Sequence, residues 1–161
     1  FHALSKAMAE KLAERRIDLI LGVARAGLFP ATAIACTLRL ELFPIRLSRR
    51  EGDQVIHGSP QWHVPVPSAV TGKRVAIVDE IADTGETLSI AAAAAQAQSA
   101  SEVITASLFA HSWAQPMPDV VGQVSDALVV FPWDAEVLMD GQWRVHPELE
   151  AFVRTKDANS R

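Results

Sequence analysis

The residues best suited to chemistry are concentrated in one short segment, VAIVDEIADTGET, at positions 75–87. Four apolar residues typical of a buried strand precede the adjacent carboxylates Asp79 and Glu80. Asp83 then opens a turn, DTGET, that leads into an alanine-rich stretch typical of a helix. Ligands of open α/β sheets bind outside the carboxyl ends of the strands. This segment is therefore a candidate binding site.

The turn after the acidic pair has the features of an anion-binding loop. Backbone N–H groups at a helix N-terminus attract phosphate. Thr84 and Thr87 add hydroxyl donors, and Gly85 allows a close approach of the backbone. Carboxylates beside such a cradle suit a sugar phosphate, because they accept hydrogen bonds from vicinal hydroxyls while the cradle binds the 5′-phosphate. The alternative is that the acidic residues only solvate the strand end and cap the helix.

A second turn, VARAG at 23–27, follows the apolar run at 17–24. A nest of backbone N–H groups with Arg25 beside it suits a diphosphate. The glycines of this region have P-loop spacing, but the Lys and Ser/Thr of a P-loop are missing, which argues against a nucleoside triphosphatase. An ordinary strand-to-helix turn with a solvated arginine is the alternative.

The segment 75–87 closely resembles the phosphoribosyl pyrophosphate (PRPP) signature of type I phosphoribosyltransferases. These enzymes, which are pentosyltransferases, transfer the 5-phosphoribosyl group of PRPP to a nitrogenous base and release pyrophosphate. The resemblance implies a set of PRPP-binding residues: Asp79, Glu80, Asp83, Thr84, Gly85, Glu86 and Thr87. It also implies that Asp83 is catalytic and acts on the purine N7. Arg25, Ala26 and Gly27 match the pyrophosphate loop, which the family often holds with a cis peptide bond.

Two further residues are assigned to the base by the same resemblance. Trp133 lies in FPWD, 131–134, and matches a Trp of xanthine–guanine phosphoribosyltransferases that stacks on the purine. A buried core tryptophan is the alternative. His111 stands where the purine enzymes carry a Lys that recognises the 6-oxo group. Because histidine can donate to a carbonyl or accept from an amino group, the choice of base stays open.

The resemblance implies a Mg²⁺ cofactor, since a hard cation can bridge ribose hydroxyls and pyrophosphate oxygens. Asp79 and Glu80 would contact the metal indirectly, through ribose hydroxyls or water. The expected partners are PRPP and a nucleobase, with a purine of nucleotide salvage as the expected base, in a homodimer or homotetramer. Two alternatives stay open. One is a PRPP- or nucleotide-sensing regulator without turnover, and the other is a family member that acts on a pyrimidine or another heterocycle.

The elements that position these residues are predicted to alternate between strands and helices. Apolar runs predict strands at 17–24, 43–48, 73–80, 101–110 and 126–133. Amphipathic or alanine-rich stretches predict helices at 1–16, 28–40, 88–98 and 147–154. This order implies an α/β fold in a single domain over 1–161, with an open, mostly parallel, Rossmann-like sheet flanked by helices.

Residues 49–71 are rich in proline, glycine and polar residues and are expected to form a lid or hood loop over the site. Arg46, Arg49 and Arg50 lie at the start of this segment. These arginines are either solvated surface residues or a source of positive potential for the diphosphate.

Composition narrows the class of protein. The chain has 161 residues, 49% of them hydrophobic and 21% charged, with a net charge of −4. The acidic balance argues against a partner nucleic acid. The single cysteine, Cys36, cannot form an internal disulfide; a core position and a reducing compartment are expected for it. No apolar run approaches the roughly 18 residues of a membrane span, and no signal peptide is recognised. We therefore expect a cytoplasmic protein without a membrane partner.

Overall fold

The structure is a computed structural model that describes residues 1–51, 54–56, 58–147 and 149–150. Residues 1–126 form one compact unit, and the residues from 127 onward form a second. A single domain over 1–161 stays a prediction.

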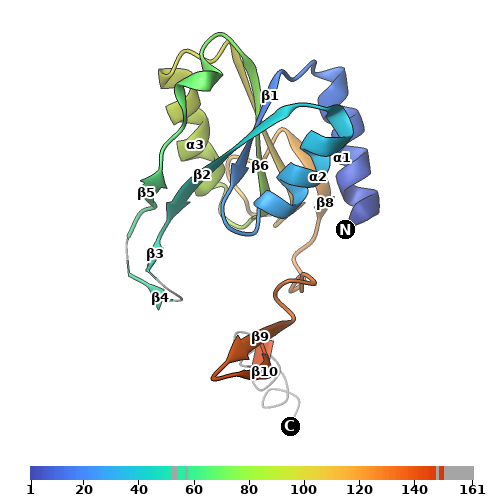
Figure 1. Ribbon diagram of the computed structural model, residues 1–161, viewed down its shortest axis with the longest axis vertical. Coiled ribbons are helices and arrows are strands. Elements are labelled where there is room, and N and C mark those ends of the chain that lie inside the picture. The colour runs from blue at the N-terminus through green and yellow to red at the C-terminus, as the bar shows by residue number, and fades with distance from the viewer. Residues whose placement is uncertain (52–53, 57, 148, 151–161) are drawn as a thin grey trace. The chain divides into compact units, whose positions relative to one another are not determined.

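A six-stranded sheet forms the centre of the first unit (Figure 1). Its strands lie in the order β5-β2-β1-β6-β7-β8. Their bounds are β1 Leu19–Val23, β2 Glu41–Ser48, β5 Gln61–Val64, β6 Arg74–Ala82, β7 Glu102–Ala110 and β8 Val120–Val124. β5 pairs with β2 in antiparallel orientation, whereas the other neighbours are parallel. The predicted open, mostly parallel sheet is thus confirmed.

Three helices cover the sheet: α1 His2–Glu14, α2 Leu28–Leu38 and α3 Glu86–Ala97. α1 and α2 lie together on one side of the sheet, and α3 lies on the other (Figure 1). β1 is buried along its whole length, as is the first half of β6 from Val75 to Val78. Burial on both faces explains why these strands read as continuous apolar runs rather than as alternating patterns. The central strands therefore bring their carboxyl ends to one protected edge.

Two sequence expectations about the sheet and its helices are wrong. The strand expected at 126–133 is irregular in the structure, and the last strand of the sheet is β8 instead. β8 is an edge strand with exposed Gln123 and Val124, so its apolar signal is weaker than that of the run after it. Cys36 is exposed rather than in the core, because Ile34 and Ala35 belong to the buried face of α2 and Cys36 does not.

The segment 49–71 has more regular structure than a loop. β3 Arg50–Glu51 pairs with β4 Gln54–Val55 in a short antiparallel ladder. β5 returns along β2, and the 3-10 helix η1 Ser68–Val70 leads into β6. Residues 52, 53 and 57 lie outside the described residues. The role of this segment as a lid stays a prediction.

The second unit contains a β-hairpin that the sequence analysis missed. β9 Glu136–Met139 pairs with β10 Gln142–Val145 across the two-residue turn Asp140-Gly141. Both turn residues have positive φ, 51° and 74°, which is the geometry that Asp-Gly favours in tight hairpins. A turn begins at the predicted helix start, where the N–H of Leu149 donates to the carbonyl of His146 at 2.9 Å. The expected helical residues 148 and 151–154 lie outside the described residues.

In the described part of the chain, no helix combines the length and the apolar character needed to cross a membrane.

Candidate functional site

Two cavities of about 90 and 490 Å³ lie at the carboxyl ends of β1, β2 and β6. Four residues line both cavities: Arg49, Asp79, Asp83 and Thr87. The larger one is also lined by Ala24, Arg25, Ser48, Pro60 and Glu80, among others. The structure therefore brings the acidic segment and the turn after β1, which are about 55 residues apart in the sequence, to one cavity.

The acidic pair lies inside β6, because this strand runs to Ala82, two residues beyond its predicted end. Asp79 is buried and Glu80 is half-buried. The backbone N–H of Glu80 donates to Asp79 Oδ1 at 2.9 Å. Burial, followed by the nearby charge of Glu80, raises the pKa of the Asp79 carboxyl well above its usual range. A ligand that brings hydroxyl donors or positive charge to this carboxylate would offset the free-energy cost of burying its negative charge.

The predicted phosphate loop forms the turn from β6 into α3. Gly85 takes a φ of +83° at the helix N-cap, and a Cβ there would collide with the carbonyl oxygen of Pro116. The N–H of Gln115 donates to the Thr84 carbonyl at 2.8 Å, which ties the loop to the segment after β7. Gly85 has no side chain to cap α3, and the N–H of Glu86 donates to the Thr84 hydroxyl at 3.4 Å. The N–H groups of this first turn lie beside Thr87 and give the helix start the partial positive charge that attracts anions.

The predicted pyrophosphate turn packs directly on the acidic pair. A Cβ on Gly27 would lie 2.6 Å from the Val23 carbonyl oxygen and 2.7 Å from Asp79 Oδ1. This turn contains a cis peptide bond, Ala24–Arg25, directly before the residues that match the pyrophosphate loop of the family. The contact through Gly27 therefore sets the distance between the two halves of the cavity.

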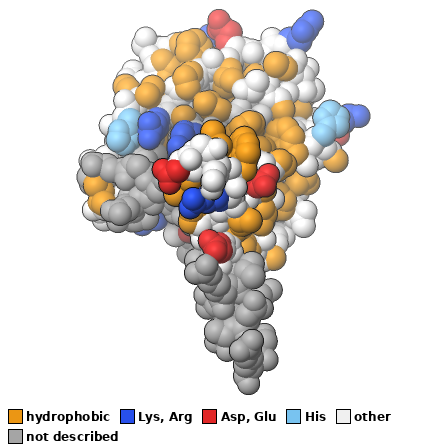
Figure 2. Space-filling view, turned by 60° about the horizontal axis from the view of Figure 1, so that its bottom comes forward, with side chains coloured by type: hydrophobic (Ala, Val, Ile, Leu, Met, Phe, Trp, Pro, Cys, Tyr) orange, Lys and Arg blue, Asp and Glu red, His pale blue; other side chains and the backbone are white. Residues whose placement is uncertain are grey.

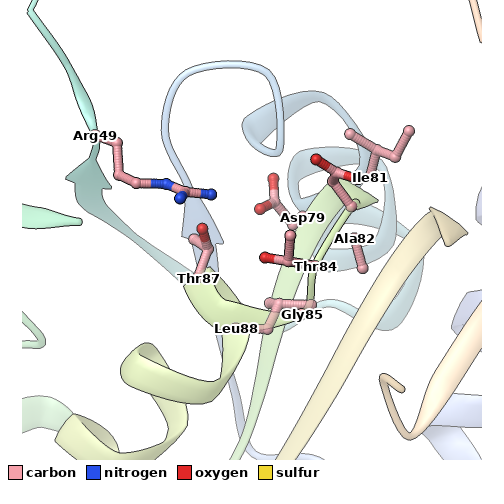
Figure 3. Close-up of a pocket in the computed structure, with 9 residues that line it drawn as sticks. Arg49, Asp79, Ile81, Ala82, Thr84, Gly85, Thr87 and Leu88 are labelled. Atoms are coloured by element: carbon pink, nitrogen blue, oxygen red, sulfur yellow. The ribbon is translucent and has the colours of Figure 1, made fainter. Parts of the chain in front are cut away.

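Arg49 reaches into the cavity from the end of β2. In Figure 3 its guanidinium points toward Asp79, and Thr87 lies just below it. Arg49 Nη1 lies 3.7 Å from Glu86 Oε2, and both side chains are partly exposed. Arg49 thus lines both cavities, and Arg46 is not among their described lining residues.

The segment after β7 contributes a residue that the sequence analysis missed. The indole Nε1–H of Trp113 donates to Asp83 Oδ1 at 3.1 Å. The Trp113 ring is stacked on that of His111, with ring centroids 4.3 Å apart and an interplanar angle of 15°. Because parallel strands place their carboxyl ends at one edge of the sheet, the position of an aromatic residue just after β7 could have indicated that it lies near the site. Among the described lining residues of the two cavities, His111 is absent.

Trp133, the predicted stacking residue, belongs to the second unit. Its ring lies nearly parallel to that of Phe131, with centroids 5.0 Å apart and an interplanar angle of 5°. Its part in base binding stays a prediction.

Positive charge for an anionic ligand comes from groups at the cavity rather than from a basic surface patch. In the face that Figure 2 shows, acidic and basic side chains are interspersed with hydrophobic ones, and neither sign dominates. Among the described lining residues of the larger cavity, the cationic side chains are Arg25 and Arg49, and the N-terminus of α3 adds a partial positive charge.

The residues present fit a magnesium ion bound together with substrate. No group of three or more His, Cys, Asp or Glu side chains in the described ranges could hold a metal ion by itself. Mg²⁺ is commonly held by one or two carboxylates, water and substrate phosphates rather than by an all-protein cage. Asp79 and Glu80 line one cavity and supply such carboxylates, and the burial of Asp79 favours a compensating positive charge.

A family model of the phosphoribosyl transferase domain matches residues 1–139. The chain belongs to the phosphoribosyltransferase family. It is therefore a glycosyltransferase-type enzyme of the type I phosphoribosyltransferase fold, as the sequence predicted.

Solved structures agree with this membership. The purine phosphoribosyltransferase from Pyrococcus horikoshii Ot3 is 31% identical, with a TM-score of 0.74, over 86% of this phosphoribosyltransferase and 91% of that chain. A hypothetical protein from Neisseria gonorrhoeae with bound ppGpp is 25% identical, with a TM-score of 0.68, over 87% and 86% of the two chains.

The Helicobacter pylori xanthine-guanine-hypoxanthine phosphoribosyltransferase shares the fold, at 17% identity and a TM-score of 0.62 over 94% and 92% of the chains. No curated protein sequence matches the phosphoribosyltransferase described here.

Proposed function

We propose that this phosphoribosyltransferase transfers the 5-phosphoribosyl group of PRPP to a purine base and releases pyrophosphate. The observation that carries the proposal is the single cavity lined by the acidic pair, by Asp83 and Thr87, and by the turn with Arg25. Its parts match the parts of PRPP: a diol, a monophosphate and a diphosphate. The likeness to a purine phosphoribosyltransferase at 31% identity supports the choice of a purine.

Each part of the cavity has a proposed role in holding PRPP. Asp79 and Glu80 accept hydrogen bonds from the ribose hydroxyls. The loop 83–87 binds the 5′-phosphate through the N–H groups at the start of α3 and through the hydroxyls of Thr84 and Thr87. Arg25 and the N–H groups of Ala26 and Gly27 bind the pyrophosphate.

In the reaction, the bond between ribose C1 and the pyrophosphate oxygen breaks as a nitrogen of the base bonds to C1. The ribose passes through an oxocarbenium-like state, and negative charge collects on the departing pyrophosphate. Arg25 stabilises that charge together with Arg49, which lines the same cavity. Asp83 accepts a hydrogen bond or a proton from the purine N7. The protein thus contributes mainly position and charge complementarity.

Mg²⁺ would be held here by Asp79 and Glu80 through ribose hydroxyls or water, and when bound it supplies charge neutralisation for the pyrophosphate. The segment 49–71 closes over the cavity and keeps water from the reactive sugar. Arg49 and Pro60 line the larger cavity from this segment, which supports that role. Trp133 stacks on the base and His111 contacts its edge. Purine salvage in the cytoplasm, by a homodimer or homotetramer, is the setting that we infer from the family resemblance.

A second candidate is a nucleotide-sensing protein of the same fold without turnover. The neighbour from Neisseria gonorrhoeae that contains bound ppGpp favours it. Asp83, Asp79 and Glu80 are all present at the cavity, and this set favours catalysis over sensing.

The test is a spectrophotometric screen of bases with PRPP and Mg²⁺. Hypoxanthine, guanine, xanthine, adenine and uracil are each compared with a reaction that lacks PRPP. Turnover of one or more purines is the expected result. PRPP or ppGpp binding without turnover of any base would support the sensing protein, and turnover of uracil alone would overturn the choice of a purine.

A further inference from the structure

The Asp83 carboxylate has a partner that the proposed reaction does not use. Trp113 Nε1–H donates to Asp83 Oδ1 at 3.1 Å, across 30 positions of the sequence. Trp113 is about half exposed, at 52% of its full surface, so it does not serve mainly as a core residue. Its indole makes a hydrogen bond to the Asp83 carboxylate and stacks on the ring of His111. Both contacts are to residues assigned to the reaction.

The Trp113 ring is held by a framework anchored to the end of β7. It stacks on His111, whose Nδ1 lies 2.8 Å from the Ser125 carbonyl oxygen. Because a carbonyl oxygen only accepts, Nδ1 carries the hydrogen and the imidazole plane is set by this bond. Ser112, which lies between His111 and Trp113, donates from both its N–H and its hydroxyl to the Asp126 carboxylate at 2.8 Å. The indole N–H is thus presented from a fixed position.

The same framework is joined to the phosphate loop at Gln115 and Pro116. The N–H of Gln115 donates to the Thr84 carbonyl at 2.8 Å. Gly85 packs so closely on the Pro116 carbonyl that a side chain cannot be placed there. Asp83 is exposed and begins a turn, where its side chain would otherwise sample several rotamers. A hydrogen bond to one carboxylate oxygen removes that freedom and leaves the second oxygen for a ligand.

We propose that Trp113 is a positioning residue that holds the Asp83 carboxylate through Oδ1, so that Oδ2 is directed to the base. The proposal rests on the proposed function for the role of Asp83. Trp113 acts through Asp83 and does not stack on the base. His111 has a part in this arrangement as well, since its ring supports the indole.

Steady-state kinetics separate positioning from stacking. Trp113→Phe keeps an aromatic ring against His111 and removes the N–H donor. Trp143→Phe, on an exposed residue of β10, makes the same chemical change and is the matched control. We expect Trp113→Phe to lower kcat about tenfold, since small misplacements of a catalytic group are costly. The KM for PRPP and for the base should stay within about twofold, as energy lost only in the transition state appears in kcat.

A double-mutant cycle tests whether Asp83 carries the effect. In an Asp83→Asn background, Trp113→Phe should lower kcat by less than about twofold, because coupled residues are not additive. An unchanged kcat in Trp113→Phe, the same loss in both backgrounds, or a rise in the KM of every base with kcat preserved would each overturn the proposal. The last result would make Trp113 a stacking residue.

Indole N–H NMR tests the contact without any turnover. The chain has four tryptophans, so a ¹H–¹⁵N spectrum shows the Trp113 indole as the signal lost in Trp113→Phe. We expect Asp83→Asn to shift that signal upfield, because a hydrogen bond to a charged carboxylate is stronger than one to an amide. A signal that does not move would overturn the proposal. If the signal moves but the wild-type protein turns over no base, the proposed function fails while the contact between Trp113 and Asp83 stands.

Discussion

Replacing Asp79 by asparagine should stabilise the protein while destroying its affinity for PRPP. Asparagine has the same shape, and its Oδ1 can still accept the Glu80 N–H bond that measures 2.9 Å in the structure. The substitution therefore opens no cavity and removes only the buried charge and its repulsion with Glu80. Relief of one poorly compensated buried polar group is worth about 1–3 kcal/mol. For a chain of this length that corresponds to a rise in Tm of roughly 2 to 12 °C.

The sign of the pH dependence follows from the raised pKa of Asp79. Burial favours the protonated carboxyl in the folded state, so the charged form costs stability as pH rises above the ordinary value of about 3.9. At pH 4 the carboxyl of the unfolded chain is still about half protonated, so little of this penalty has developed. The gain in Tm from Asp79→Asn should therefore be small in acid and should grow toward neutral pH.

Calorimetric unfolding from pH 4 to 8, together with titration of PRPP and Mg²⁺ into the folded proteins, measures both effects. Asp140→Asn is the matched control, since it makes the same chemical change at an exposed turn. A Tm at pH 7 below that of the wild type, or a gain that does not vary with pH, would refute the reasoning about burial. Unchanged PRPP affinity would remove Asp79 from the binding site.

Three further predictions concern residues assigned to the site. Gly27→Ala should cost about 1–3 kcal/mol of stability and weaken PRPP binding at least tenfold, because its Cβ would lie 2.6 Å from the Val23 carbonyl oxygen. Gly58→Ala, which meets nothing within 4 Å, is its control in denaturation and calorimetry. Asp83→Asn should lower kcat by about 100-fold or more and leave PRPP affinity nearly unchanged; equal losses in both would make its role structural. His111→Lys should raise the ratio of kcat/KM for hypoxanthine over adenine, and a ratio that stays constant would show that this position does not select the base.

Much of the site was predictable because its signals are local. The apolar run that ends in Asp79 and Glu80, and the turn with Gly85, lie within 13 consecutive residues, so strand, loop and helix start can be recognised together. The parallel sheet follows from the alternation of such runs with helices. The end of β6 was placed two residues early, since acidic residues are typical of strand ends rather than strand interiors.

What the sequence left out depends on contacts between distant segments. The hydrogen bond from Trp113 to Asp83 joins the ends of two neighbouring strands, and local periodicity carries no signal for it. The packing of Gly27 on Asp79 is of the same kind. The hairpin turn at Asp140 is different, because an Asp-Gly pair between short apolar segments is a local sequence pattern typical of β-hairpins. This hairpin could therefore have been predicted from the sequence.

The most direct test of the account is ³¹P NMR of the wild-type protein with PRPP, Mg²⁺ and a mixture of hypoxanthine, guanine and xanthine. We predict that PRPP signals fall while pyrophosphate and a nucleoside monophosphate ester appear in equal amounts, and that neither product forms when the bases are omitted. Asp79→Asn should form neither product under the same conditions. Intact PRPP in the complete mixture, or pyrophosphate release without a nucleotide product, would contradict the assignment of phosphoribosyl transfer to a purine.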